Sequence, residues 1–166
     1  MHPAGTLGFG VADIFWPWLF PSTYLIHIAE EYWGGEGYSA HMAKTKGVRL
    51  TARRFFFLTG MGWLIMIAGI FVAEMLNFPQ LILVIFGTLV LANGLSHALT
   101  GVLTAKYNPG LFTGVLLWIP LGAITLARLN GSMSAGRYFA GMALGVGIQL
   151  AVSLLAKSSG SIGSAG

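Results

Sequence analysis

The residues best suited to chemistry lie in one short motif, H-I-A-E-E, which runs from His27 to Glu31. Its histidine and two carboxylates are spaced i, i+3 and i+4, so on a helix they share about 100° of one face. Imidazole nitrogens and carboxylate oxygens are ligands that zinc and non-haem iron accept in proteins. Only 8% of the residues are charged, and the stretch from Val11 to Ile28 is nearly all apolar. Ionisable groups beside so apolar a stretch indicate a functional site.

A second polar group lies on another apolar stretch further along the chain. Asn93 and His97 are spaced i, i+4, and Thr100 follows His97 at i+3. A helix would therefore present these three side chains within about 60° of arc. His97 is the second histidine that falls inside an apolar run, and we expect it to meet His27.

Together the two groups predict a divalent metal, zinc more readily than iron, because imidazoles and a carboxylate form a ligand set for both ions. The candidate metal ligands are His27, Glu30, Glu31, His97 and, if its loop folds back, His41. If one glutamate binds the metal, the other can act as general base on a bound water. Asn93 can hold a ligand carboxylate or a water. The candidate catalytic residues are therefore Glu30, Glu31 and Asn93.

The elements that must position these groups are membrane-spanning helices. Hydrophobic residues make up 55% of the 166-residue chain, and apolar runs long enough to cross a bilayer follow one another closely. We expect an all-α membrane protein, a bundle of five transmembrane helices, at about residues 11–33, 50–75, 81–105, 111–129 and 138–156. They form a single domain over residues 1–157, followed by a flexible tail at 158–166. We expect a loop at 34–48, and Pro17 and Pro21 predict a kink or a late start in the first helix.

The distribution of basic residues predicts the orientation in the membrane. With five spans, seven basic residues fall on one side, namely Lys44, Lys46, Arg49, Arg53, Arg54, Lys106 and Lys157. The other side receives only Arg128 and Arg137. The positive-inside rule then predicts an inner- or plasma-membrane protein with its N-terminus outside and its C-terminus in the cytoplasm. In this orientation His27 and His97 lie about 9 and 12 Å inside the cytoplasmic boundary, so they approach one depth from two helices.

Composition also narrows the partners. The chain has no cysteine, which excludes disulfides and thiolate metal sites. We expect membrane lipid and a lipophilic small-molecule substrate as partners, and no nucleic acid, because no soluble basic surface is large enough. Gly141 and Gly145 form a G-x-x-x-G pair, which indicates close helix packing and, as a sharper interpretation, a homo-oligomer.

The function favoured by these observations is that of a metal-dependent membrane enzyme of the hydrolase type, acting on a lipophilic substrate near the cytoplasmic side. A non-haem iron desaturase or hydroxylase is an alternative, although such membrane oxygenases usually carry more histidines than the four here. A metal-free isomerase or cyclase for isoprenoid or sterol-like substrates is another, since a buried carboxylic acid can protonate an alkene. A bis-histidine haem protein that uses His27 and His97 is the fourth.

Three motifs occur in order along the chain: H-x-x-E-E at 27–31, followed by Tyr32 and a Gly-Gly pair, then N-x-x-x-H at 93–97 and Y-x-P-G at 107–110. In these motifs the chain resembles the HXXEE-domain membrane proteins, over roughly Ile26 to Gly122. The resemblance implies a small helical membrane protein with a metal site, and it supplies no established reaction. The sequence W-G-G-E-G at 33–37 departs from the proline and aromatic expected around the Gly-Gly pair.

Overall fold

The computed structural model describes residues 15–48, 50–76 and 78–158, and this part of the chain is all-α. Four segments in it are long and apolar enough to cross a membrane: Ala52–Met75, Pro79–Thr104, Leu111–Leu129 and Ala135–Ala156. They correspond to α4 (Ala52–Met75), α5 (Pro79–Thr104), the segment from α6 to α7, and α8 (Ala135–Ser158). The predicted all-α fold is confirmed, and four of the five expected spans are present as candidates. The expected tail lies outside the described residues from position 159 onward.

The H-x-x-E-E motif lies on α2 (Leu19–Trp33), a helix of 15 residues. The helix begins after Pro17, and Pro21 falls in its first turn, where a missing backbone N–H costs no hydrogen bond. The prolines predicted a kink or a late start: Phe15 is already helical, the regular helix is interrupted at 16–18, and it continues from Leu19. Residues 11–14 of the expected first span lie outside the described residues.

The segment expected as a loop at 34–48 contains a helix of its own, α3 (Tyr38–Lys46). Glycines delimit it, because Gly37 before it and Gly47 after it have φ angles of +75° and +65°. Such left-handed conformations favour glycine and end regular helix, while the alanine, methionine and lysine residues between them favour helix. The prediction of a plain loop was therefore wrong, and His41 lies on a short helix.

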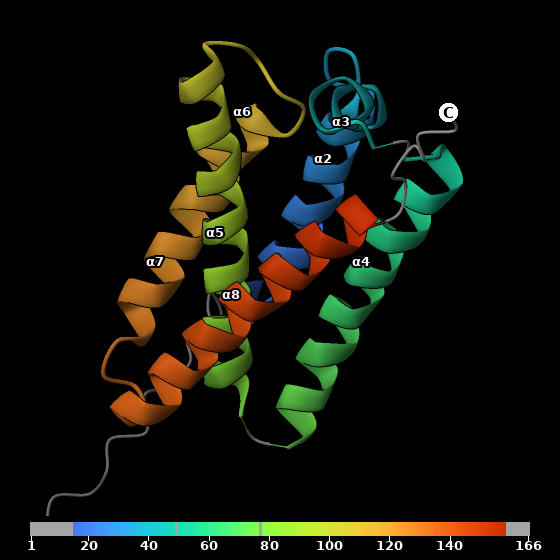
Figure 1. Ribbon diagram of the computed structural model, residues 1–166. Coiled ribbons are helices and arrows are strands. Elements are labelled where there is room, and N and C mark those ends of the chain that lie inside the picture. The colour runs from blue at the N-terminus through green and yellow to red at the C-terminus, as the bar shows by residue number, and fades with distance from the viewer. Residues whose placement is uncertain (1–14, 49, 77, 159–166) are drawn as a thin grey trace, which may run out of the picture.

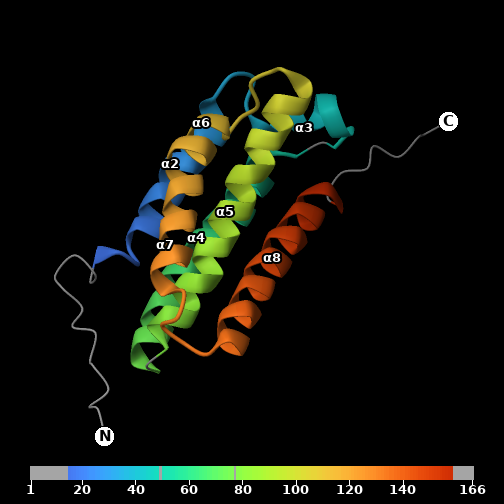
Figure 2. The same cartoon turned by 90° about the vertical axis from the view of Figure 1, so that its left-hand side faces the viewer.

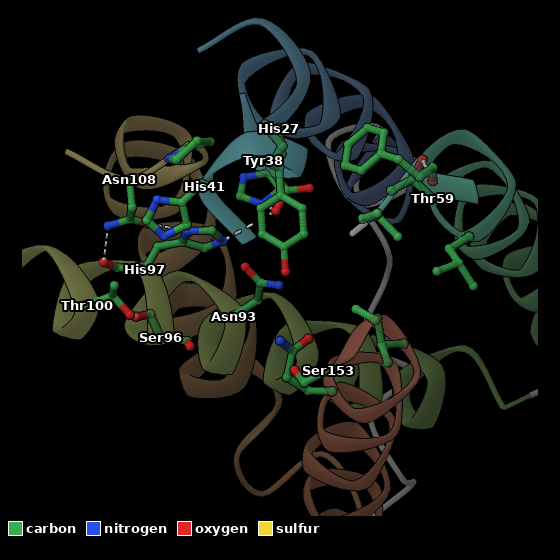
Figure 3. Close-up of a pocket in the computed structure, with 18 of the residues that line it drawn as sticks. His27, Tyr38, His41, Thr59, Asn93, Ser96, His97, Thr100, Asn108 and Ser153 are labelled. Atoms are coloured by element: carbon green, nitrogen blue, oxygen red, sulfur yellow. Dashed lines mark hydrogen bonds and ion pairs between the residues drawn. The ribbon is translucent and has the colours of Figure 1, made fainter. Parts of the chain in front are cut away.

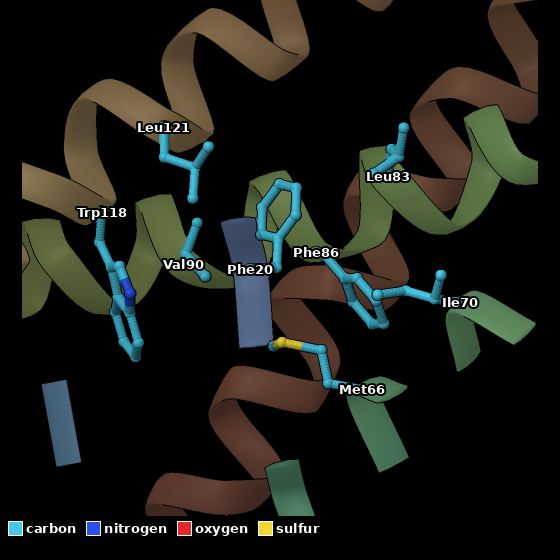
Figure 4. Close-up of a cluster of buried hydrophobic side chains, with 8 residues drawn as sticks. All are labelled: Phe20, Met66, Ile70, Leu83, Phe86, Val90, Trp118 and Leu121. Carbon is cyan, nitrogen blue, oxygen red and sulfur yellow. The ribbon is translucent and has the colours of Figure 1, made fainter. Parts of the chain in front are cut away.

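Helix α5 is the centre of the bundle (Figures 1 and 2). It packs against α4 and α8. It also packs against three consecutive elements, α6 (Leu111–Thr113), η1 (Gly114–Trp118) and α7 (Ile119–Leu129). Helix α2 packs against α4, α6 and η1. A buried apolar cluster joins α2, α4, α5 and the η1–α7 segment (Figure 4), and its members are Phe20, Met66, Ile70, Leu83, Phe86, Val90, Trp118 and Leu121. This packing brings the motif-bearing part of α2 close to the C-terminal part of α5.

The fourth candidate span is interrupted by a π-helical turn, η1. Pro120 is the second residue after this turn. Its ring has no N–H and would collide with the carbonyl of Leu116 in a regular α-helix, so a wider turn accommodates it. At the same level Gly94 of α5 touches this segment, since a Cβ built on Gly94 would lie 2.6 Å from the carbonyl oxygen of Gly114. The backbones of α5 and η1 are therefore in direct contact. Single π-turns of this kind occur frequently at functional sites.

The G-x-x-x-G pair of α8 packs against α5. A Cβ on Gly141 would lie 2.9 Å from Val84, and one on Gly145 would lie 2.6 Å from the carbonyl oxygen of Ile85. The pair is thus a helix-packing signal within one chain, and a homo-oligomer through this face stays a prediction.

Candidate metal centre

Three of the predicted ligands, His27, Glu31 and His97, come together where α2 meets α5, and Figure 3 shows the two histidines side by side. The Nε2 atom of His27 lies 3.6 Å from Oε1 of Glu31, one turn further along α2. The Nε2 atom of His97, from α5, lies 3.5 Å from the same carboxylate oxygen. The two imidazole centroids are 5.2 Å apart, and the potential ligand atoms of all three residues lie within 4.8 Å of one another. This group could hold a metal ion.

The tautomer of His97 is set by Asn108, in the link between α5 and α6. The side-chain nitrogen of Asn108 donates a hydrogen bond to the backbone carbonyl of His97 at 3.1 Å, which fixes the orientation of the amide. Its oxygen lies 2.7 Å from Nδ1 of His97 and can only accept. Nδ1 of His97 therefore carries the proton, and in the neutral ring Nε2 presents a lone pair.

The tautomer of His27 is set by a longer chain of hydrogen bonds. The hydroxyl of Thr113 donates its single proton to the carboxylate of Glu30 at 2.5 Å. The same hydroxyl oxygen lies 2.7 Å from Nδ1 of His27, so it must accept a hydrogen bond from the N–H of that nitrogen. In the neutral ring, the Nε2 atom of His27 then also carries a lone pair, and this lone pair points toward Glu31.

With both imidazole rings neutral, three electron-rich atoms face a common point. Separations of 3.5 and 3.6 Å are too long for the N–H···O hydrogen bonds of proteins, and Nε2 of His27 is buried with no hydrogen-bond partner among the described residues. Around a tetrahedral zinc ion with bonds of 2.0–2.1 Å, ligand atoms lie about 3.3 Å apart. The donor types and their spacing therefore fit a divalent metal.

Glu30, the other carboxylate of the motif, is turned away from this point. One of its oxygens accepts hydrogen bonds from the hydroxyl of Tyr107 and the backbone N–H of Phe112, both at 2.9 Å. The other accepts from the backbone N–H of Thr113 at 2.7 Å and from the Thr113 hydroxyl. Burial and the hydrogen bond to Glu30 raise the pKa of Tyr107 to about 12, so Tyr107 stays a donor. Glu30 is therefore connected to His27 through the hydroxyl of Thr113, which bonds to both side chains.

The remaining candidates lie beside the group. His41 lies on α3 with its Nδ1 atom 3.6 Å from Oε1 of Glu36, and it does not join the group. Asn93 lies on α5, and its Oδ1 atom is buried without a hydrogen-bond partner among the described residues. Asn93, His97 and Thr100 all line one cavity, as their helical spacing predicts.

Gly110, the last residue of the Y-x-P-G motif, is in contact with both histidines. Its φ of +92° suits glycine, and a Cβ there would lie 2.7 Å from Cε1 of His97 and 2.9 Å from Cε1 of His27. The Gly-Gly pair after α2 packs against the same α5–α6 link that contains Gly110, because a Cβ on Gly35 would lie 2.9 Å from the ring of Tyr107. Residues of all three sequence motifs therefore contact one another at the candidate metal centre.

Three supporting residues were not predicted from the sequence: Thr113, Asn108 and Trp118. Asn108 falls inside the Y-x-P-G motif, which is the only signal that points to it. Thr113 and Trp118 stand in an apolar span with no distinguishing spacing. Trp118 stacks on His27 and is 1% exposed. It is the last residue of the π-turn η1, which no sequence pattern predicts.

The candidate metal-binding group, His27, Glu31 and His97, lines part of a cavity of about 230 Å³. Besides the group itself, the cavity is lined by residues of α3, α4, α5, the α5–α6 link, η1 and α8 (Figure 3). A molecule in this cavity would contact the centre directly.

Fold and site together define a helical protein with candidate membrane spans and a buried two-histidine, one-glutamate group. A family model described as "Protein of unknown function with HXXEE motif" matches residues 18–125, and the chain belongs to this family. The match contains His27, Glu31 and His97, and it confirms the resemblance found in the sequence. Comparison with curated proteins and with solved structures gave no match.

Proposed function

We propose that this protein is a metal-dependent integral membrane enzyme of the hydrolase type, acting on a lipophilic substrate. Its divalent ion, zinc more readily than iron, is bound by His27, Glu31 and His97. The observation that carries the proposal is the convergence of two imidazole lone pairs and one carboxylate oxygen, with both Nδ1 protons engaged elsewhere.

A bound divalent ion would supply Lewis acidity and lower the pKa of a water molecule beside it, which is the basis of metal-assisted hydrolysis. Three protein ligands leave one position for water or substrate, as in catalytic zinc sites. The chain's own residues hold the geometry, since hydrogen-bonded partners of ligand histidines fix their orientation. Because Glu30 accepts four hydrogen bonds, we assign it to positioning His27 through Thr113 and not to the role of general base.

A non-haem iron oxidoreductase is the second candidate, because two histidines and one carboxylate are also the facial ligand set of iron oxygenases. A bis-histidine haem is less compatible with the geometry. Haem iron would need the two imidazoles on opposite faces of a flat ring, whereas Oε1 of Glu31 lies within 3.6 Å of both Nε2 atoms.

We further propose that residues 11–33 form a fifth transmembrane span and that the centre lies near the cytoplasmic side. In Figure 1, α3 and the link from α5 to α6 lie at the same end of the bundle, where α4 begins. This end carries Lys44, Lys106 and Arg53, and the positive-inside rule favours the cytoplasm for such a cluster.

Elemental analysis of detergent-purified protein tests the proposal. We expect about one zinc ion per chain in the wild type and loss of the ion in His27→Ala and His97→Ala, since each removes one of three ligands. His41→Ala is the matched control, because it removes a histidine of the same cavity that lies outside the group, and it should keep the metal. Wild-type protein that retains no zinc after reconstitution and dialysis would refute the proposal. Retained iron together with an oxygen-dependent product would favour the second candidate.

A further inference from the structure

The cavity beside the metal group extends between two candidate membrane spans. Its walls include Leu58 and Thr59 on α4, and Gln149, Val152 and Ser153 on α8. Figure 3 shows Ser153 across the cavity from the histidines, with Asn93 between them. Both helices pack against α5 and both are candidate membrane spans, so this part of the cavity wall belongs to candidate membrane-spanning segments.

The charge of the lining determines which head groups the cavity can hold. None of its lining residues in the described part of the chain is lysine or arginine. The nearby Lys44 is not part of the lining, and its ammonium lies 3.3 Å from a carboxylate oxygen of Glu36. Phosphate groups in proteins are usually held by arginine or lysine. A phosphorylated head group would therefore find no lysine or arginine to neutralise its charge in this lining.

Two buried polar atoms on cavity residues have no hydrogen-bond partner among the described residues, and a ligand could supply one to each. The Oδ1 atom of Asn93 and the indole Nε1 atom of Trp118 are both buried without hydrogen-bond partners among the described residues. An unsatisfied buried polar atom is costly, so each indicates a missing partner. Asn93 calls for a hydrogen-bond donor such as a hydroxyl, and Trp118 calls for an acceptor such as a carbonyl oxygen.

The size of the cavity limits how much of a substrate it encloses. Its volume of about 230 Å³ lies below the roughly 300–1,000 Å³ of pockets that enclose drug-sized ligands. It can hold a small head group and the first carbons of a chain. The rest of an acyl chain would pass between α4 and α8, where Leu58 and Val152 supply an apolar lining.

We propose, on the basis of the function proposed above, that the substrate is an uncharged single-chain amphiphile with a hydroxyl-bearing ester head group, such as a monoacylglycerol. It enters from the bilayer between α4 and α8, and its hydroxyl donates to Asn93. The reaction adds water across the ester. The water oxygen bonds to the acyl carbon, the acyl C–O bond breaks, and the alcohol oxygen takes a proton from water, which leaves a carboxylic acid and glycerol.

Binding of uncleavable analogues tests this substrate class without relying on turnover. The probes are 1-O-decylglycerol and its 3-phosphate, titrated by tryptophan fluorescence into zinc-loaded protein in phosphatidylcholine nanodiscs. We expect the neutral ether to bind at least about tenfold more tightly than the phosphate. Equal or tighter binding of the phosphate would overturn the proposal.

Two variants locate the binding site. Asn93→Leu should weaken binding of the neutral ether about tenfold, and Ser153→Phe, which fills the cavity from α8, should do the same. Asn130→Leu, at the end of α7 and outside the cavity lining, should leave it unchanged. Zinc content is measured on every variant, since none of the three residues belongs to the ligand group. Unchanged ether binding in zinc-loaded Asn93→Leu or Ser153→Phe would refute the substrate class alone, whereas absence of zinc from the wild type would refute the proposed function.

Discussion

The indole ring of Trp118 lies flat against the imidazole of His27, with centroids 3.7 Å apart and planes 25° apart. Tyr24 stacks against the same indole at 5.8 Å. His27 is 2% exposed, so its ring is held by aromatic packing as well as by the hydrogen bond to Thr113. Trp118 is therefore both a core residue and a support for the candidate metal centre.

Replacing Trp118 should affect stability and metal binding together. For Trp118→Ala we expect a loss of about 3–5 kcal/mol in the free energy of unfolding, as for other buried aromatic truncations, together with weaker zinc binding. Thermal unfolding in detergent and zinc titration measure the two effects. Trp33→Ala is the control, because Trp33 is 74% exposed, and it should change neither. A fully stable Trp118→Ala protein would contradict the packing described here.

The hydroxyl of Thr113 should control zinc affinity through the orientation of His27. Thr113→Val removes the link to Glu30 and should weaken zinc binding about 10–100-fold, the usual effect of losing such a partner. Thr113→Ser keeps the hydroxyl and should restore most of the affinity. Thr100→Val is the control, since the hydroxyl of Thr100 bonds to the backbone carbonyl of Ser96. Equal affinities in the valine and serine variants would show that the hydroxyl has no positioning role.

The two adjacent glutamates should respond differently to the same change. Glu31→Gln removes the ligand carboxylate and should abolish zinc binding. Glu30→Gln places an amide group, itself a donor, among the donors that contact Glu30, and should weaken binding about tenfold without abolishing it. Zinc titration monitored by competition with a chelator gives both affinities. The reverse order would mean that Glu30 is the ligand.

Gly110 should tolerate no side chain. Gly110→Ala combines an unfavourable φ with contact against both imidazoles, so we expect lower thermal stability and loss of zinc. Gly131→Ala separates the two causes, because Gly131 has φ +85° and open space around it. Its destabilisation should be clearly smaller and its zinc content normal. Similar effects of both substitutions would mean that backbone conformation alone matters at Gly110.

Tyr107 should titrate at unusually high pH. Burial and its hydrogen bond to Glu30 raise its pKa from 10.0 to about 12. Because the folded protein favours the neutral phenol, the stabilisation is complete below pH 10 and is lost as the pH rises through about 12. The ultraviolet difference titration of wild type minus Tyr107→Phe should show this midpoint. A midpoint near 10 would mean that the hydrogen bond does not form.

The sequence by itself was sufficient for the long apolar helices and for the prediction that His27 and His97 meet. Membrane-crossing helices are readable because length and apolarity are local properties of the chain. The spacing of Asn93, His97 and Thr100 also predicts correctly that they share one face, since helical periodicity is local too. Helix α3 and the π-turn were missed, because they depend on glycine conformations and on Pro120 within a packed bundle.

The choice between Glu30 and Glu31 was made only by the tertiary structure. Consecutive residues on a helix point about 100° apart, so the two carboxylates of one motif meet different neighbours. Helix α5 brings His97 to Glu31, while the backbone at the start of α6 surrounds Glu30 with donors. The sequence of α2 determines the spacing of these groups, but which neighbour each one meets depends on how distant segments pack. This packing distinguishes Glu31, which could bind a metal, from Glu30, which contacts donors at the start of α6.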